Sequence, residues 1–205
     1  YNFSSGDLIR WYRDLFQPAV SSLDELFLDL PDQPAQVLVL PHFAGSGTPT
    51  LDARSKGAVL GLSLATDRRE ILRGIVDGQN YEMRLNLEIW RRHGIAFDCL
   101  RAYGKGSSCD RLLQIKSDIL GLAVEKLSVV ETGCLGAAAL AARRAEPTFP
   151  LAETLAAAVS AGPAAWRRVV RPGRARGPLR RRADIALMPS RAAIRRGWAS
   201  IRAAR

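Results

Sequence analysis

The feature that most constrains the fold is one long amphipathic segment, residues 66–94, with strand-like runs before and after it. Thr66 can cap such a helix, and Asp67 and Glu70 suit the positive end of its dipole. Gly94 provides the stop signal. The apolar residues fall on one stripe: Leu72, Val76, Met83, Leu87 and Trp90, with Ile71 and Ile75 beside it. The segment therefore predicts a long helix with one buried face.

Short apolar runs around this helix predict strands. Residues 36–43 (QVLVLPHF) predict a strand buried on both faces, and residues 57–64 (GAVLGLSL) predict another. The opening segment with Trp11, Leu15 and Phe16, after the small-residue turn at residues 4–6, predicts a helix, and residues 21–30 predict a second one with Ser22 near its cap. The later elements follow in the order strand 97–103, glycine loop, helix 109–121, strand 122–130 and helix 133–145. This alternation is typical of an α/β fold with a covered sheet.

The net charge of +10 belongs to one end of the chain. Residues 161–205 hold thirteen arginines, no lysine and one acid, Asp184. The body of the chain therefore has no electrostatic reason to seek nucleic acid. Beyond Pro147 the composition shifts to Ala, Arg, Gly and Pro. We place a boundary there, between a domain at 1–146 and a partly helical, Arg/Ala-rich extension at 147–205.

The extension carries an apolar stripe of its own, made by Leu187, Ile194, Trp198 and Ile201. We interpret the extension as a drifted terminal segment. The alternative is an anchor for nucleic acid or an acidic surface, which the arginines would support.

Catalytic and metal-binding constellations are missing from the sequence. His42 and His93 stand far apart without ligand-spaced partners, and His93 falls at a helix C-terminus, where a cation is favoured. Ser107, Ser108 and Cys109 have no base nearby in the sequence, which disfavours a nucleophile. We therefore predict no catalytic residue and no metal site.

Cysteine usage and hydropathy indicate a cytoplasmic protein. The three cysteines, Cys99, Cys109 and Cys134, are odd in number and far apart, as expected of reduced thiols. The sequence shows no secretory signal and no apolar run of membrane-spanning length, so a membrane partner is not expected.

The loop YGKGSSCD, residues 103–110, follows a predicted strand and opens a predicted helix. In that context backbone N–H groups and the helix dipole can face an anion or a nucleotide. The loop matches neither GxxxxGK[ST] nor GxGxxG, because Gly104 and Gly106 supply only two of the required glycines. From the residues alone, a plain turn and a ligand loop both stay open. AGSGTP, residues 44–49, is not followed by a helix and is interpreted as a structural loop.

Four stretches occur in series: residues 4–14 (SSGDLIRWYRD), residues 41–64 (PHFAGSGTPTLDARSKGAVLGLSL), the long helix, and residues 103–125 closing with ETGCLGAAALAA. The long helix contributes Gly78, Tyr81 and Arg84. In this order and spacing, the stretches resemble the C-terminal domain of the FGGY carbohydrate kinases over about residues 1–145. The LPHFAGSGTP form leans towards xylulokinase-like members.

The resemblance implies an actin-like (ribonuclease H-like) ATPase domain, with a mixed sheet flanked by helices. In this family ATP lies in a cleft between two domains, and closure brings its γ-phosphate to a sugar hydroxyl. Catalysis of such a transfer is mostly positioning and charge stabilisation, with Mg²⁺ on the phosphates. The implied cofactors are ATP and Mg²⁺.

The resemblance carries six nucleotide-binding positions onto this chain: Gly6, Arg10, Gly104, Lys105, Ser108 and Cys109. The first two match the start of the domain, and the other four match the loop that holds the adenosine end. Two of them depart from the family pattern. Lys105 stands at the middle glycine of a GGG or GGA run, and Cys109 stands where Ser or Asn is usual.

The resemblance also places the family's catalytic Asp, its sugar contacts and its main phosphate loops upstream of Tyr1. We expect this chain to lack the catalytic Asp and to phosphorylate nothing by itself. Its first function class is the ATP-binding half of a carbohydrate kinase, which meets its sugar, a pentulose such as xylulose, through an N-terminal domain absent here. The second is a non-catalytic remnant or binding module. A homodimer is left open.

Overall fold

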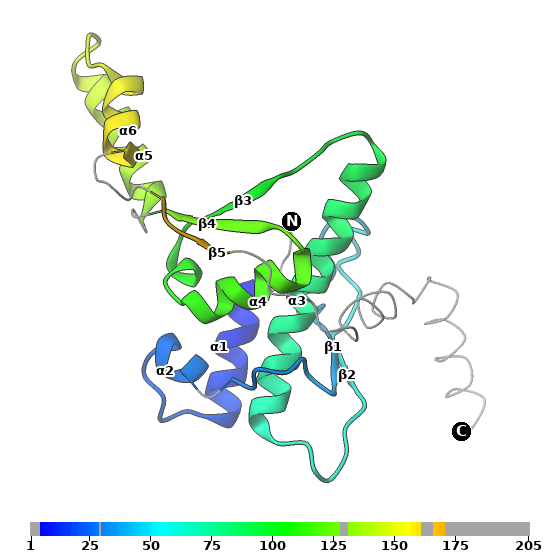
Figure 1. Ribbon diagram of the computed structural model, residues 1–205. Coiled ribbons are helices and arrows are strands. Elements are labelled where there is room, and N and C mark those ends of the chain that lie inside the picture. The colour runs from blue at the N-terminus through cyan, green and yellow to red at the C-terminus, as the bar shows by residue number, and fades with distance from the viewer. Residues whose placement is uncertain (1–4, 29, 128–130, 161–165, 171–205) are drawn as a thin grey trace. The chain divides into compact units, whose positions relative to one another are not determined.

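The computed structural model describes residues 5–28, 30–127, 131–160 and 166–170 (Figure 1). These residues form two compact units. The first contains residues 5–18 and 30–93, and the second contains residues 19–28 and those described between 94 and 170. The stripe predicted from Leu187 to Ile201 lies outside the described residues. Among the helices described, none is both long enough and apolar enough to cross a membrane.

The first unit contains two helices and a two-stranded sheet: α1 (Ser5–Phe16), β1 (Leu38–Leu40), β2 (Ala58–Leu60) and α3 (Arg68–Arg92). The predicted opening helix is confirmed. Its buried face consists of Leu8, Ile9 and Tyr12, and the Tyr12 hydroxyl donates to the Arg68 carbonyl at 2.7 Å. Trp11 remains 40% exposed, so this ring contributes only part of its area to the core.

The long helix is confirmed, but its cap is not the predicted one. Asp67, not Thr66, is the N-cap, and its side chain accepts a 2.9 Å hydrogen bond from the Glu70 amide. A carboxylate at this position also interacts favourably with the helix dipole. Gly94 follows the C-cap His93 with φ +81°, as expected of a glycine that ends a helix.

The apolar stripe of α3 is buried only over part of its length. Leu72, Val76 and Leu87 are buried, as is Ile75 beside them. The predicted members Met83 and Trp90 are 39% and 48% exposed. The helix is therefore longer than the surface that covers it within the described residues.

β1 is shorter than predicted and is buried mainly on one face. Val37 and Val39 are buried, whereas Leu38 and Leu40 are half-buried. β1 pairs antiparallel with β2, with Val39 opposite Val59. A two-stranded sheet covered by one helix has one core face, so side chains alternate between burial and partial exposure.

Glycines let α3 lie directly against β1 (Figure 1). A Cβ at Gly78 would lie 2.2 Å from the Val39 carbonyl oxygen, a distance that real Cβ atoms do not reach. A Cβ at Gly74 would lie 2.8 Å from Val37 Cγ2 and 2.9 Å from Val39 Cγ2. The α3–β1 contact therefore depends on the missing side chains at two positions one helical turn apart.

A buried ion pair anchors the chain that leads into β1. Arg73 Nε donates to Asp77 Oδ1 at 2.8 Å, and both side chains are at most 5% exposed. Arg73 Nη1 also donates to the Pro31 carbonyl at 2.5 Å, and the Ala35 amide donates to Asp77 Oδ2 at 3.0 Å. Burial raises the pKa of Asp77, while the Arg73 guanidinium acts against that rise. Losing one partner of such a pair costs about 3–5 kcal/mol.

His42 has partners that its sequence neighbourhood did not predict. Its Nδ1 lies 2.7 Å from Ser55 Oγ, and its Nε2 forms a short hydrogen bond with Glu82 on α3. These partners are 13 and 40 residues away in the chain. His42 therefore joins both ends of the loop 42–55 to the long helix.

The second unit contains a three-stranded mixed sheet and four α-helices: α2 (Leu23–Leu28), β3 (Cys99–Ala102), η1 (Lys105–Ser107), α4 (Asp110–Leu120), β4 (Ala123–Leu127), α5 (Thr132–Ala145), α6 (Leu151–Ser160) and β5 (Trp166–Val170). β4 is central, parallel to β3 and antiparallel to β5. The predicted cap of α2 is confirmed, because Ser22 Oγ accepts from the Glu25 amide at 3.1 Å.

A compact core forms where α4 meets β4. Leu113 and Val124 are at most 1% exposed, and Leu100 packs against them. Gly121, at φ +66°, ends α4 in the left-handed conformation and lets the chain reverse. The buried Ser117 hydroxyl donates to the Leu122 carbonyl at 2.7 Å, which satisfies a polar group within this reversal.

The Gly78→Ala variant tests the close packing of α3 on β1. An alanine normally favours a helix interior by about 1 kcal/mol over glycine. Here the added methyl would collide with the Val39 carbonyl, so we expect the free energy of unfolding by urea to fall by about 1–3 kcal/mol. Gly136→Ala on α5 is the matched control, because nothing lies within 4 Å of its Cβ and it should stabilise. A stable Gly78→Ala protein would contradict this packing.

The His42→Ala variant tests the tie between loop 42–55 and α3. Losing the two hydrogen bonds should make opening of the loop easier by about 1 kcal/mol, or about fivefold. Limited proteolysis with trypsin measures this at Arg54, whose side chain is 94% exposed. His93→Ala is the control, since that histidine is exposed at the end of α3. Equal cleavage rates in both variants would show that His42 does not hold the loop.

Candidate functional site

The loop predicted to bind nucleotide lies between β3 and α4 of the second unit. Gly104 takes φ +82°, a conformation that favours glycine, and the chain then makes the single 3₁₀ turn η1. The loop leaves the sheet at the carboxyl end of β3, where the parallel strand β4 also ends. In open α/β sheets, this edge is where ligands bind.

Ser107 closes the turn twice. Its amide donates to the Gly104 carbonyl at 2.9 Å, and its hydroxyl donates to the same oxygen at 2.7 Å. The side chain is only 2% exposed. Ser107 is therefore a structural residue of the turn, in agreement with the expectation that it is no nucleophile.

The backbone tolerates the lysine at the middle position of the loop. Lys105 belongs to η1. Its φ is not positive, since Leu51 is the non-glycine residue with positive φ among the described residues. A side chain at position 105 therefore adds no backbone strain. A Cβ at Gly104 or at Gly106 would meet nothing within 4 Å, so both glycines border open space.

Cys109 is the N-cap of α4, with φ −87° and ψ 105°, but its thiol makes no capping hydrogen bond. A Ser or Asn at an N-cap usually accepts from the first turn of the helix, and its loss costs about 1 kcal/mol. A thiol is a weaker acceptor. The departure from the family pattern at this position is therefore visible in the geometry.

Gly6 and Arg10 lie on α1, in the first unit. Gly6 has no atom within 4 Å of a built Cβ, and Arg10 donates to Asp7 Oδ1 at 3.0 Å. Both Arg10 and Asp7 are largely exposed. The loop residues Gly104, Lys105, Ser108 and Cys109 lie together in the second unit. The nucleotide contacts assigned to all six positions stay predictions.

One polar neighbour of the loop was missed from the sequence. Lys126 on β4 reaches the Ser108 carbonyl at 3.1 Å and Asp110 Oδ1 at 3.3 Å. No sequence motif marks it, because it lies 16 residues beyond Asp110. The parallel register, which places Lys126 beside Ala102, is the signal that would have found it.

The described residues do not build a metal site of their own. No group of three or more His, Cys, Asp or Glu side chains comes together among them. Mg²⁺ usually binds through one or two carboxylates plus substrate phosphates. These residues therefore do not fit a dedicated magnesium site.

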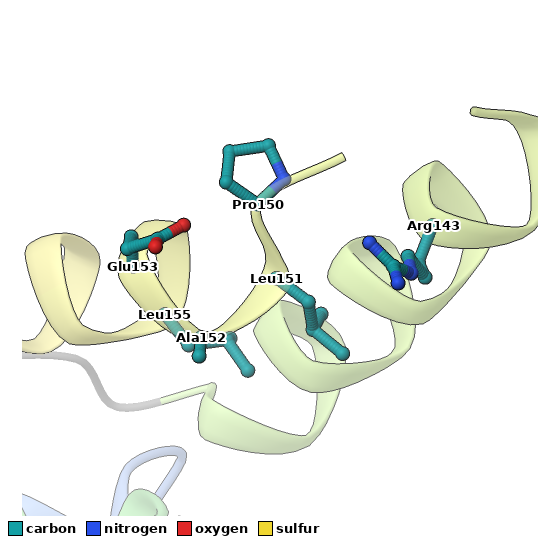
Figure 2. Close-up of a pocket in the computed structure, with 6 residues that line it drawn as sticks. All are labelled: Arg143, Pro150, Leu151, Ala152, Glu153 and Leu155. Carbon is teal, nitrogen blue, oxygen red and sulfur yellow. The ribbon is translucent and has the colours of Figure 1, made fainter. Parts of the chain in front are cut away.

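A hollow of about 500 Å³ lies at the α5–α6 hairpin. Its lining residues, drawn in Figure 2, are Arg143, Pro150, Leu151, Ala152, Glu153 and Leu155. It contains none of the six predicted nucleotide-binding residues. The Arg143 guanidinium donates to the Phe149 carbonyl at 2.7 Å and so closes the connection between the two helices. The lining of this hollow contains no cluster of side chains that indicates a reaction.

Solved structures of carbohydrate kinases share the fold of this chain. A xyloylose kinase from Brucella ovis aligns with a TM-score of 0.66 and 24% identity, over 88% of this chain and 36% of that one. A Plasmodium falciparum glycerol kinase with ADP aligns with a TM-score of 0.60 and 21% identity, over 75% of this chain and 31% of that one. The predicted α/β fold is confirmed: the chain has the actin-like ATPase fold of sugar kinases.

Sequence comparison then shows the family. The profile of the FGGY family of carbohydrate kinases, C-terminal domain, matches residues 2–145. A glycerol kinase of Pseudothermotoga lettingae is 35% identical over 142 residues, and one of Desulforamulus reducens is 36% identical over 141. Each alignment covers 68% of this chain and 28% of the relative, so the chain spans a little over a quarter of these curated relatives. The chain belongs to the FGGY family of carbohydrate kinases.

Two loop glycines provide a matched test of this geometry. Gly104→Ala forces a side chain into the left-handed region, which costs about 1–2 kcal/mol. Gly106→Ala adds the same methyl group two residues later, where φ is not positive and the space is open. We expect urea unfolding to show a loss of stability only for Gly104→Ala. Equal stabilities would mean that Gly104 does not take this conformation in solution.

Proposed function

We propose that this chain supplies the ATP- and ADP-binding half of a carbohydrate kinase that transfers the γ-phosphate of ATP to a sugar hydroxyl. The proposal includes a cytoplasmic location, where ATP is available. In this proposal, no residue of this chain removes the proton from the sugar hydroxyl. The curated relatives are several times longer than the part that aligns, which leaves room in them for a second domain.

One observation carries the proposal. Within a family match over residues 2–145, the loop 103–110 leaves the carboxyl end of a parallel strand and enters a helix. Gly104 and Gly106 leave its surface open to a ligand, so a flat adenine or ribose could approach the backbone closely. The adenosine end of a nucleotide is the ligand that fits this loop.

ATP supplies the phosphoryl group, and the residues of this chain bind and orient its other end. The turn closed by Ser107 fixes the loop, and the first turn of α4 directs a positive dipole end to the same side. Positioning of this kind is a large part of the catalysis of phosphoryl transfer. Mg²⁺ would arrive on the phosphates, and no step is assigned to it.

We propose a pentulose such as xylulose as the substrate. The LPHFAGSGTP stretch and the likeness to solved xylulose kinases support it. Glycerol is the competing substrate, because the sequence relatives are glycerol kinases. The sugar would be held outside these residues.

A second candidate function is a non-catalytic binding module that keeps the actin-like fold. Lys105 and Cys109 favour it, because each replaces a residue type that the family uses at the nucleotide loop. The two functions differ in whether the loop still binds nucleotide.

Calorimetric titration of ADP with Mg²⁺ into the purified chain, alongside a Lys105→Gly variant, tests the proposal. We expect saturable heat from the native chain, because the backbone at position 105 keeps an ordinary conformation. Heat from the variant alone would mean that the lysine side chain closes the site, which favours the second candidate. The absence of binding heat from both proteins would contradict nucleotide binding by this chain.

Thiol labelling locates the binding in the same samples. ADP should slow alkylation of Cys109, which lies in the loop, and leave the exposed Cys134 unaffected. Burial raises the pKa of Cys99, so its thiolate fraction is low and it should react slowly with or without ADP. Protection of Cys134 instead of Cys109 would place the nucleotide elsewhere.

A further inference from the structure

Lys126 contacts the nucleotide loop from a different strand. It lies on β4, in parallel register with Ala102, the last residue of β3. Its ammonium donates to the Ser108 carbonyl at 3.1 Å and to Asp110 Oδ1 at 3.3 Å. One side chain therefore holds the last part of the loop and the first turn of α4.

The two halves of the loop are held in different ways. Ser107 bonds the first half onto Gly104. At the second half, the thiol of Cys109 makes no capping hydrogen bond. The Lys126 ammonium contacts the residues on both sides of Cys109, so it anchors the junction where the side-chain cap is missing.

The environment makes these contacts worth more than an ordinary surface pair. The Lys126 side chain is 23% exposed and the Asp110 side chain 47%. A charge-assisted hydrogen bond to a carbonyl is stronger than a neutral one, and partial burial reduces screening by salt. By contrast, the Arg101–Glu125 pair across the same two strands joins a guanidinium that is 68% exposed, at 3.4 Å.

We propose that Lys126 is a positioning residue for nucleotide binding: it holds residues 108–110 in the orientation in which the loop receives the adenosine end. This inference rests on the proposed function. Two of the three ammonium donors are already used within the protein, both on residues of the loop and its helix, so the role we assign to Lys126 is on the loop. Its loss should weaken adenosine and ADP binding by the same factor.

Amide hydrogen exchange tests the anchoring without any ligand. In Lys126→Met, exchange at residues 104–110 should become about three- to fivefold faster, as expected for a partly buried ion pair and hydrogen bond. Lys126→Arg should restore slow exchange. Arg101→Met is the matched control, because it removes the ion pair between β3 and β4 and should leave the loop unchanged. Unchanged exchange in Lys126→Met would overturn the inference.

Calorimetry with adenosine and with ADP tests the consequence for binding. Lys126→Met should weaken both ligands by about three- to fivefold, and the folding equilibrium constant from urea unfolding should fall by no more than a similar factor. A loss for ADP alone would mean a direct phosphate contact and would overturn the positioning role. If the native chain binds neither ligand, the proposed function fails and the binding part of this inference fails with it. Hydrogen exchange would still decide whether Lys126 anchors the loop.

Discussion

The first unit depends on the distance between α3 and β1. Gly74 and Gly78 remove the side chains that would keep the helix and strand apart, so Val37 and Val39 meet the helix backbone directly. The segment before β1 also brings two backbone polar groups, the Pro31 carbonyl and the Ala35 amide, against α3. The Arg73–Asp77 pair supplies their partners, and it ties the segment before β1 to the helix. The close packing and the buried ion pair therefore lie on the same helix, and both hold it to β1 and the segment before it.

In the second unit, the pairing of strands brings the residues of the candidate site together. Parallel pairing of β3 with β4 brings Lys126 beside the loop that follows Ala102. This explains how the loop keeps a defined shape despite two departures from the family pattern. Lys105 adopts an ordinary turn conformation, and the missing cap at Cys109 coincides with an anchor from the neighbouring strand.

Local signals predicted most elements, and long-range contacts explain the errors. Apolar spacing and the stop glycine Gly94 identified α3, because these signals are local to the helix. The prediction of Thr66 as the cap failed because adjacent residues carry similar capping signals, and the Thr66 hydroxyl accepts from the Ser63 amide instead. Nothing in the sequence signalled the hydrogen bonds of His42. Its partners Ser55 and Glu82 are brought to it only by folding.

The sequence by itself determined the family, the order of strands and helices up to α5, and the position of the glycine loop between β3 and α4, whereas the strand β5 was not predicted. These follow from residue types and spacing along the chain, which need no knowledge of distant neighbours. Only the tertiary structure decided which residues meet: Gly78 against Val39, His42 between Ser55 and Glu82, and Lys126 at the loop. The physical reason is that strand register and helix packing bring together residues whose separation in sequence carries no signal.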